Sequence, residues 1–411
     1  MFLSLKNDSR NCFGSLRIFG SKSESNRLLI LKAIFPGIKI RNISDSDDTK
    51  ILSNALNSKS NEIDVNHAGT AMRFLTAFFS SIPGRKIILT GSNRMQERPI
   101  KILVDALNSL GANINYVNKN GFPPIKISGQ ELISRKVFLE ADVSSQYISA
   151  LMLIAPSLKN GIEINLKKGI VSKPYIEMTR DLLNYFGIRV LFTKNKIEIN
   201  PISNIENKVK LVESDWSSAS YYFSIVSLSK QAKISLNNFK QKSLQGDSVL
   251  VSIYEKFGVK TTFIGDEMII SKVPYFKLPK SISLDLNDSP DIAQTIAVSC
   301  FGLGINCELS GLKTLKIKET DRLIALKNEL EKLGAEVNLT QDSISINSSS
   351  PIKSNIIINT YDDHRMAMAF APLGLKTKIT IENPMVVGKS YPLFWDHLKQ
   401  IGFEVEKHIN F

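Results

Sequence analysis

Arginine is scarce in this chain, and its positions indicate where chemistry could take place. Of the 52 basic residues only 13 are arginine. A guanidinium is a planar double donor that suits phosphate and carboxylate groups better than an ammonium does. Six arginines fall in short segments that also carry lysine and hydroxyl residues, and these are Arg27, Arg73, Arg94, Arg98, Arg322 and Arg365. The segments therefore predict a site for small anionic ligands.

Those segments combine cations with hydroxyl groups and, later in the chain, with carboxylates. They are Lys22-Ser23-x-x-x-Arg27, Ala68–Arg73, Asn93–Pro99, Ser144-Ser145-Gln146, Ser172–Tyr175, Pro290-Asp291, Lys318–Arg322, Asp362–Arg365 and Lys389. They recur at matching places in a repeated pattern. That recurrence favours a shared anion site over isolated helix caps.

One repeated element is an amphipathic helix that ends in an apolar residue and glycine and runs into a strand. The five glycines are Gly111, Gly187, Gly258, Gly334 and Gly402, spaced 76, 71, 76 and 68 residues apart. Each is expected just past a helix C-terminus, where a left-handed residue is needed. Residues 47–56 resemble a sixth, shortened copy without its glycine.

A second repeated element is a polar opening followed by a nearly all-apolar helix. The openings begin near Lys22, Gly69, Ser144, Ser217, Asp291 and His364, with spacings of 47, 75, 73, 74 and 73 residues. Helices that are apolar on nearly all sides are buried. We expect capping residues at all six helix starts. Alternating segments such as residues 86–90, 162–166 and 378–381 predict the strands. The chain thus reads as six α/β units of about 73 residues, grouped as two similar domains of three.

Composition narrows the class of protein. A length of 411 residues suggests two or three domains, and 43% hydrophobic with 22% charged residues is ordinary for a globular enzyme. No stretch predicts a membrane span or a secretory signal. Three cysteines and four histidines predict neither disulfides nor a metal site, so we expect a cytoplasmic protein. The net charge of +13 reflects spread-out lysine and predicts no nucleic-acid partner.

The common glycine-rich motifs for phosphate and dinucleotide binding are incomplete in this sequence. Asn383 stands where a phosphate loop ending at Gly388-Lys389-Ser390 needs its first glycine. Cys307 occupies the third glycine position after Gly302-x-Gly304. The acidic run at residues 45–48 is expected to cap a helix, and Cys300 and Cys307 are expected to be buried core thiols.

In combination, the segments around Gly69, Arg94, Lys318 and Arg365 resemble the 5-enolpyruvylshikimate-3-phosphate synthase family of enolpyruvyl transferases, also called 3-phosphoshikimate 1-carboxyvinyltransferases. The resemblance runs in order from about Phe19 to Trp395. It implies an α/β fold with two similar domains, each of three βαβαββ repeats in an inside-out barrel. Residues 1–20 and 214–411 would form a discontinuous domain on the phosphoenolpyruvate side. Residues 21–213 would form the shikimate 3-phosphate side.

The resemblance also implies a reaction. The carboxyvinyl group of phosphoenolpyruvate would move to the 5-hydroxyl of shikimate 3-phosphate with release of phosphate, on the shikimate pathway to chorismate and the aromatic amino acids. Shikimate 3-phosphate would contact Lys22, Ser23, Arg27, Ser144, Ser145, Gln146, Ser172, Tyr175, Asp291 and Lys318. Phosphoenolpyruvate would contact Lys22, Gly69, Arg94, Gln146, Arg322, Arg365 and Lys389. No cofactor or metal is implied, and we expect a monomer.

Charge supports this assignment. The two substrates bring roughly −5 to −6 near neutral pH. Seven matched cations, namely Lys22, Arg27, Arg94, Lys318, Arg322, Arg365 and Lys389, would oppose that charge in one cleft. The family implies Asp291 as base and Glu319 as proton donor, with Lys22 beside the proton's path. A cationic cleft lowers carboxylate pKa values, which suits the base and opposes Glu319 as an acid.

Departures from the family pattern bear on inhibition. His67 stands where many members carry Asn, Phe74 replaces a frequent Pro, and Thr314 lies near a position often filled by Asn. Gly69 predicts inhibition by glyphosate, and Phe74 leaves its potency open. The first repeat is shortened between residues 56 and 66, and we expect this to affect its peripheral strands.

Three alternatives remain. UDP-N-acetylglucosamine enolpyruvyl transferase shares the fold, but residues 93–99 lack that enzyme's loop cysteine. A basic nucleic-acid-binding protein would show steep salt dependence of binding. An inactive anion-binding scaffold would not need both carboxylates. We further expect like charges to hold the two halves apart until anions bridge them.

Overall fold

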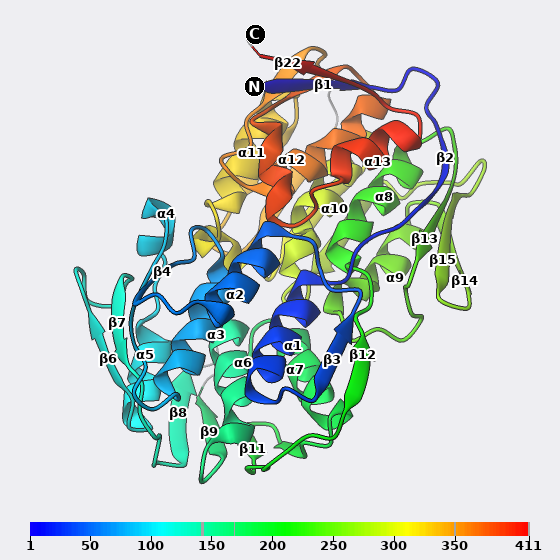
Figure 1. Cartoon of the computed structure of the whole chain (residues 1–411). Coiled ribbons are helices and arrows are strands. Elements are labelled where there is room, and N and C mark those ends of the chain that lie inside the picture. The colour runs from blue at the N-terminus through cyan, green and yellow to red at the C-terminus, as the bar shows by residue number, and fades with distance from the viewer. Residues whose placement is uncertain (141–143, 168, 349–350, 410–411) are drawn as a thin grey trace. The chain divides into compact units, whose positions relative to one another are not determined.

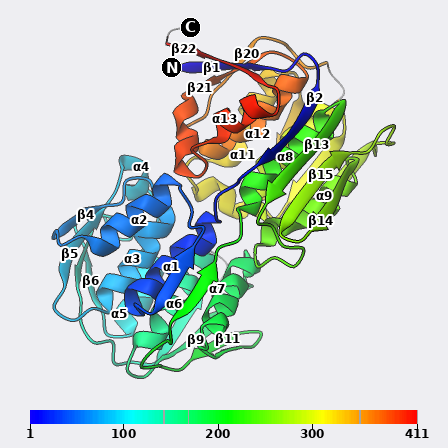
Figure 2. The same cartoon turned by 45° about the vertical axis from the view of Figure 1, so that its right-hand side comes forward.

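The computed structural model describes residues 1–140, 144–167, 169–348 and 351–409. The chain divides into two compact units. Unit 1 consists of Met1–Phe19 and Glu213–Phe411, and unit 2 consists of Gly20–Val212. Each unit is built from three sheets and the helices packed on them (Figures 1 and 2).

Unit 2 contains the first three repeats. Its strands are β3 (Ile38–Arg41), β4 (Glu62–Asp64), β5 (Lys86–Thr90), β6 (Asn113–Tyr116), β7 (Ile125–Ser128), β8 (Lys136–Glu140), β9 (Ile162–Lys167), β10 (Val190–Phe192), β11 (Lys196–Ile199) and β12 (Lys208–Leu211). Its helices are α1 (Lys22–Ile34), α2 (Asp47–Asn57), α3 (Gly69–Ser80), α4 (Asn93–Gln96), α5 (Lys101–Ser109), α6 (Ser145–Ile154), the 3-10 turn η1 (Ala155–Ser157) and α7 (Lys173–Tyr185).

Unit 1 contains the other three. Its strands are β1 (Phe2–Lys6), β2 (Asn11–Leu16), β13 (Gln231–Asn237), β14 (Val259–Ile264), β15 (Glu267–Lys272), β16 (Ser281–Asp285), β17 (Asn306–Ser310), β18 (Glu336–Leu339), β19 (Ile344–Asn347), β20 (Ile356–Ile358), β21 (Ile379–Glu382) and β22 (Glu404–His408). Its helices are α8 (Trp216–Leu228), α9 (Leu250–Glu255), α10 (Ala293–Leu303), α11 (Arg322–Lys332), α12 (His364–Phe370) and α13 (Phe394–Gln400). The 3-10 turns η2 (Gly246–Val249), η3 (Pro290–Ile292), η4 (Lys313–Ile317), η5 (Ala371–Leu375) and η6 (Pro384–Lys389) lie between them.

Five of the six sheets share one topology, which confirms the predicted repeat. An edge strand pairs in parallel with the second strand, and two antiparallel strands complete the sheet, as in β4-β5-β7-β6 and β16-β17-β19-β18. Within the described residues the sixth sheet has only β12 and β3, in the shortened first repeat. The N-terminal β1 lies antiparallel between β21 and the C-terminal β22 and so completes the last repeat (Figure 1).

The helices follow the predicted pattern at their C-termini. Gly111, Gly187, Gly258, Gly334 and Gly402 all have a φ between 75° and 105°, the left-handed conformation that glycine adopts without strain. The buried helices α1, α3 and α6 contact one another in unit 2, and α10 contacts both α8 and α12 in unit 1. Nearly every residue of α8, α10 and α12 is buried, so the core of unit 1 is a helix layer beneath the sheets.

The prediction of capping residues at all six buried helices is wrong for two of them. Side chains of Ser21, Ser144, Asp215 and Asp363 cap α1, α6, α8 and α12. Helix α3 follows Ala68 and α10 follows Ile292, and neither start has a side-chain cap. The N–H groups of a first helical turn have no partner within the helix. At α10 the N–H of Ala293 is bonded to the Pro290 carbonyl of η3, whereas α3 begins without a side-chain partner for its N–H groups.

Other local predictions are confirmed. The acidic run lies at the start of α2 as predicted, but the side chain that caps the helix is Ser46 rather than a carboxylate. Cys300 and Cys307 are buried, as is Cys12. Among the described residues, no helix is both long and apolar enough to cross a bilayer.

Candidate functional site

Unit 1 gathers five predicted site residues, among them Arg322, the first residue of α11. Arg322 Nη1 lies 3.1 Å from Oδ1 of Asp291, and Nη2 lies 2.8 Å from Oε2 of Glu319. Lys318 Nζ lies 3.5 Å from Asp291 Oδ1, and Arg365 Nη2 lies 3.1 Å from Asp291 Oδ2. The residues come from η3, the segment after η4, and the starts of α11 and α12. Polar openings of two successive repeats therefore converge within this unit.

Asp363 holds the centre of this cluster, although the sequence analysis gave it no role. It is fully buried and accepts from Arg322 Nε at 2.6 Å and from Nη2 at 3.3 Å. The same carboxylate caps α12 by accepting from the backbone N–H of Arg365 at 2.8 Å. Its place at a helix start, two residues before Arg365, is the only sequence signal that could have indicated it.

The charges around Asp291 decide its protonation state. Burial by itself raises the pKa of Asp291, but the positive charges of Arg365, Lys318 and Arg322 together lower it well below its usual range. Asp291 is therefore a carboxylate at neutral pH, as the cationic surroundings predicted. Glu319 is ion-paired with Arg322, and contact with a guanidinium favours a carboxylate over a carboxylic acid. This ion pair therefore opposes the role of proton donor that the family implies for Glu319.

Arg365 also contacts a half-buried hydroxyl and, through it, a second carboxyl group. Its Nη1 donates to the backbone carbonyl of Asp291 at 2.9 Å, and its Nη2 lies 3.3 Å from Ser217 Oγ. Ser217 in turn donates to Asp247 Oδ2. Burial first, and then the charge of Asp291, raise the pKa of Asp247 to about 7. Neither Ser217 nor Asp247 was identified as a site residue from the sequence.

Lys389 lies at the end of η6 and donates to the backbone carbonyl of Asp362. Tyr361 and Asp362 both have a positive φ, 52° and 53°. This conformation is uncommon for residues other than glycine, and it turns the chain immediately before Asp363. Lys389 is thereby connected to the turn that leads into α12 and Arg365.

In unit 2, Arg27 organises the predicted residues for shikimate 3-phosphate. It is almost fully buried. Nε donates to Thr179 Oγ1 at 2.7 Å, Nη1 to the Ser23 carbonyl at 2.8 Å, and Nη2 to Ser149 Oγ at 3.1 Å and the Tyr175 carbonyl at 3.2 Å. Among the described residues, these contacts use four of its five N–H groups. Burial lowers the pKa of Arg27 to about 10. Arg27 thus joins α1, α6 and α7.

The other predicted residues of unit 2 lie at helix starts. Ser144 caps α6, and Ser145 is its first residue. Gln146 donates to Thr70 Oγ1 at the start of α3 at 3.3 Å, which connects α6 with the Gly69 segment. Ser172 precedes α7 in a left-handed conformation with φ 52°. Arg94 in α4 is part-exposed and pairs with Glu97 at 3.0 Å.

Lys22 contacts a carboxylate that the sequence analysis assigned only to helix capping. Its Nζ lies 3.1 Å from Asp48 Oδ2, and His67 Nε2 lies 3.7 Å from Asp48 Oδ1. His67, the departure from the family pattern, thus faces the same carboxylate as Lys22. It stands two residues before Gly69.

The charge count from the sequence was too simple. Of the seven matched cations, five pair with carboxylates inside their own unit, namely Lys22, Arg94, Lys318, Arg322 and Arg365. Formal positive charge therefore overstates the charge available to a ligand. That cations from both units line one shared cleft stays a prediction.

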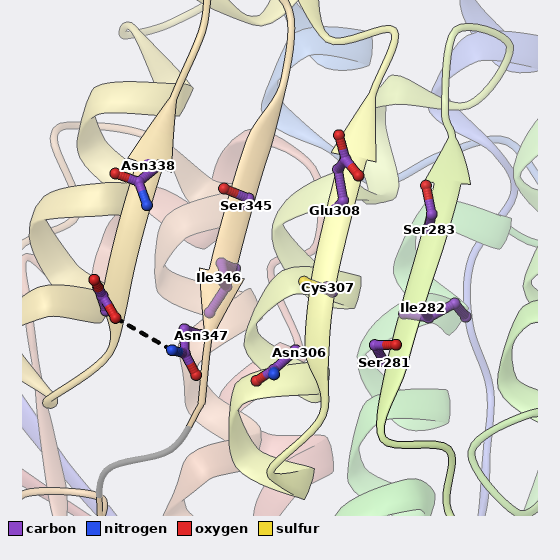
Figure 3. A pocket seen from close by; sticks show the side chains of 11 residues that line it. Ser281, Ile282, Ser283, Asn306, Cys307, Glu308, Asn338, Ser345, Ile346 and Asn347 are labelled. Carbon is purple, nitrogen blue, oxygen red and sulfur yellow. Dashed lines mark hydrogen bonds between the residues drawn. The ribbon is translucent and has the colours of Figure 1, made fainter.

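Unit 1 also has surface depressions away from its ion-paired residues. One of about 480 Å³ lies on the outer face of the β16-β17-β19-β18 sheet (Figure 3). Ser283, Glu308, Asn338 and Ser345 line it, and its lining includes no lysine or arginine. Because a polyanion needs cationic partners, this surface does not fit the predicted substrates.

Comparisons with known proteins agree with the fold and the motifs. The family model described as EPSP synthase (3-phosphoshikimate 1-carboxyvinyltransferase) matches residues 51–398. A 3-phosphoshikimate 1-carboxyvinyltransferase of Bacteroides fragilis is 44% identical over 397 residues, covering 95% of this chain and 96% of the relative. One from Haemophilus influenzae (strain PittGG) is 36% identical, covering 94% and 96%.

Solved structures support the fold. EPSP synthase from Acinetobacter baumannii superimposes with a TM-score of 0.78 at 21% identity, over 99% of this chain and 100% of that one. The enolpyruvyl transferase NikO from Streptomyces tendae gives a TM-score of 0.72 at 12% identity, over 98% of each chain. These likenesses confirm the predicted α/β enolpyruvyl transferase fold.

Proposed function

The chain belongs to the EPSP synthase (3-phosphoshikimate 1-carboxyvinyltransferase) family, and we propose that its two clusters of site residues carry out the reaction of that family. The observation that carries the proposal is the assembly of Asp291, Lys318, Glu319, Arg322 and Arg365 around shared ion pairs in unit 1. The enzyme transfers the carboxyvinyl group of phosphoenolpyruvate to the 5-hydroxyl of shikimate 3-phosphate and releases phosphate.

Protons move in both steps of the reaction, the addition and the elimination. In the addition step, the 5-hydroxyl oxygen bonds to C2 of phosphoenolpyruvate, the hydroxyl loses its proton, and C3 gains one. In the elimination step, phosphate leaves C2 and C3 loses a proton, which restores the double bond. General acid–base groups must lie within hydrogen-bond reach of these atoms. Asp291, as a carboxylate, takes the proton of the 5-hydroxyl. Glu319 donates a proton to C3 in the addition step, and Lys22 lies beside the path of the proton.

The cations would bind and orient the substrates. Arg322, Arg365 and Lys389 from unit 1, with Lys22, Gly69, Arg94 and Gln146 from unit 2, hold phosphoenolpyruvate. Shikimate 3-phosphate lies against Lys22, Ser23, Arg27, Ser144, Ser145, Gln146, Ser172 and Tyr175, with Asp291 and Lys318. Ligand anions can replace the carboxylates that now pair with these cations, and the resulting proximity accounts for much of the rate gain.

The wider assignment follows from the same proposal. Residues 21–213 form the shikimate 3-phosphate domain and residues 1–20 with 214–411 the phosphoenolpyruvate domain. The enzyme works as a cytoplasmic monomer without cofactor, metal or nucleic acid, and glyphosate competes with phosphoenolpyruvate. An inhibition constant in the millimolar range would contradict the last point.

The central test is phosphate release by the purified chain with both substrates present and with each omitted. Release that requires both supports the proposal, and release without shikimate 3-phosphate contradicts it. Replacing shikimate 3-phosphate with UDP-N-acetylglucosamine tests the related acceptor. For the acid role, Glu319→Gln should lower turnover strongly, and near-normal turnover would remove Glu319 from the chemistry.

A further inference from the structure

Arg98 is a buried arginine whose charge is unmatched in the described part of the chain. Only 7% of the residue is exposed, and its Nε is buried without a hydrogen-bond partner. Among residues 1–140, 144–167, 169–348 and 351–409, the guanidinium forms no hydrogen bond and no ion pair. Its Nε is thus removed from water without a compensating hydrogen bond, which is costly. Such a group is expected where a ligand supplies the missing counter-charge.

The guanidinium lies against the start of helix α3. A Cβ placed on Gly69 would stand 2.6 Å from Arg98 Nη1, 2.8 Å from Nη2 and 2.9 Å from Cζ. The three similar distances place the guanidinium against the Cα of Gly69. A side chain at this position would occupy the space of the guanidinium, so Arg98 would have to shift. The guanidinium of Arg98 therefore lies in close contact with the backbone of Gly69.

Helix α3 offers further donors at the same place. Its N-cap is Ala68, which gives no side-chain cap, and its first turn contains no acidic residue. The helix has 12 residues, so its N-terminus carries the partial positive charge of a full helix. Free N–H groups and a guanidinium together suit an anion with several acceptor oxygens, of which phosphate is the best matched.

Neighbouring contacts hold Arg98 in this position. Arg73 Nη1 donates to the Gly69 carbonyl and Nη2 to the Pro99 carbonyl, both at 3.2 Å. Tyr147 also donates to the Pro99 carbonyl, at 2.6 Å, and the backbone N–H of Arg98 donates to the Met95 carbonyl at 3.1 Å. The segment that carries Arg98 is thus fixed to α3 and α6 from both sides, and the site is built before any ligand arrives.

We propose that Arg98, together with the first turn of α3, receives the phosphate group of phosphoenolpyruvate. This inference rests on the proposed function and adds a binding residue to it. Lys22 and Arg94 already pair with Asp48 and Glu97. Arg98 would add a positive charge to that of these two residues.

Steady-state kinetics of Arg98→Gln test the proposal. We expect KM for phosphoenolpyruvate to rise at least about tenfold, since a charge-assisted contact is lost, and KM for shikimate 3-phosphate to change less than about twofold. Arg85→Gln is the control, because Arg85 is a part-exposed arginine of the same unit that donates to the carbonyls of Ser58 and Lys59. It should leave both KM values unchanged.

Thermal unfolding followed by circular dichroism separates binding from a merely structural role. In chloride buffer Arg98→Gln should be at least as stable as the parent chain, because the guanidinium loses no hydrogen-bond partner and its buried, unpartnered Nε is removed. Inorganic phosphate at equal ionic strength should raise the Tm of the parent chain and of Arg85→Gln but not of Arg98→Gln. Pyruvate, which has a carboxylate and no phosphate, should not reproduce the effect.

Gly69→Ala provides an independent check, because the new methyl group must displace the guanidinium. It should raise KM for phosphoenolpyruvate as Arg98→Gln does, and the double variant should add little. In the kinetics, the proposal is overturned if Arg98→Gln leaves KM for phosphoenolpyruvate unchanged, or if it lowers stability and raises both KM values together. In thermal unfolding, it is overturned if phosphate raises the Tm of Arg98→Gln as much as that of the parent chain, or if pyruvate alone raises the Tm. If the parent chain releases no phosphate from its substrates, the proposed function fails, and the phosphate-stabilisation arm still tests Arg98.

Discussion

Replacing Asp363 with asparagine should destabilise unit 1 far more than the same change at another helix cap. Asp363 is fully buried and contacts Arg322, itself 2% exposed, through both carboxylate oxygens. Removing one partner of a buried ion pair costs about 3–5 kcal/mol. Arg322 keeps Asp291 and Glu319, so we expect about 3 kcal/mol, at the lower end. Asparagine retains the oxygen that caps α12, so the loss reports the charge pair.

The control is Asp321→Asn. Asp321 caps α11 by accepting from Leu323 and Ile324, but no buried arginine depends on it among the contacts described. This change should cost less than about 1 kcal/mol. The two variants therefore share the chemistry of the substitution and differ in the buried guanidinium.

Urea unfolding followed by tryptophan fluorescence measures this difference. The chain has two tryptophans, Trp216 and Trp395, and both belong to unit 1, so the signal reports that unit alone. A loss of about 3 kcal/mol should lower the midpoint by about 1 M urea. If Asp363→Asn shifts the midpoint no further than Asp321→Asn does, the ion pair is not a determinant of stability and the reasoning is refuted.

Three further outcomes are expected. The folded chain keeps a proton on Asp247 up to its raised pKa of about 7, whereas the unfolded chain loses it near pH 4. Stability should therefore fall by about 2–3 kcal/mol between pH 5 and pH 7 relative to Asp247→Asn; parallel fluorescence curves would contradict this. Arg27→Met removes four hydrogen bonds and should destabilise unit 2 by about 3 kcal/mol, seen by circular dichroism with an unchanged fluorescence midpoint. Gly129→Ala places a Cβ 2.1 Å from the Ile82 carbonyl oxygen and should cost at least about 2 kcal/mol, whereas Gly169→Ala, in open space, should cost little.

Much of the architecture could be predicted because its determinants are local. Gly111 and Gly334 mark helix ends, since a residue just past a helix C-terminus must often adopt a positive φ and glycine does so without strain. The nearly all-apolar segments mark the buried helices, and alternation marks strands such as β5. Repetition of these patterns at about 73 residues was enough to indicate two domains of three units.

The candidate residues were also found from the sequence, because their types and order match a family motif. The carboxylates with which these residues pair in the folded chain were not found from the sequence. Arg322 and Asp363 are 41 positions apart, and Lys22 and Asp48 are 26 apart. No local periodicity connects such pairs, so counting charges along the chain gave seven cations without the carboxylates that neutralise five of them.

Residue types, their order and their spacing determined the repeats, the helix ends and the set of residues that could handle anions. Only the tertiary structure decided which of those charges are already paired, that Asp363 holds Arg322, and that the guanidinium of Arg98 fills the space beside Gly69. The physical reason is that helix caps and periodicity act over a few residues of chain, whereas the energy of a charge depends on its distance to every other charge and on its burial. Those quantities exist only once the chain is folded.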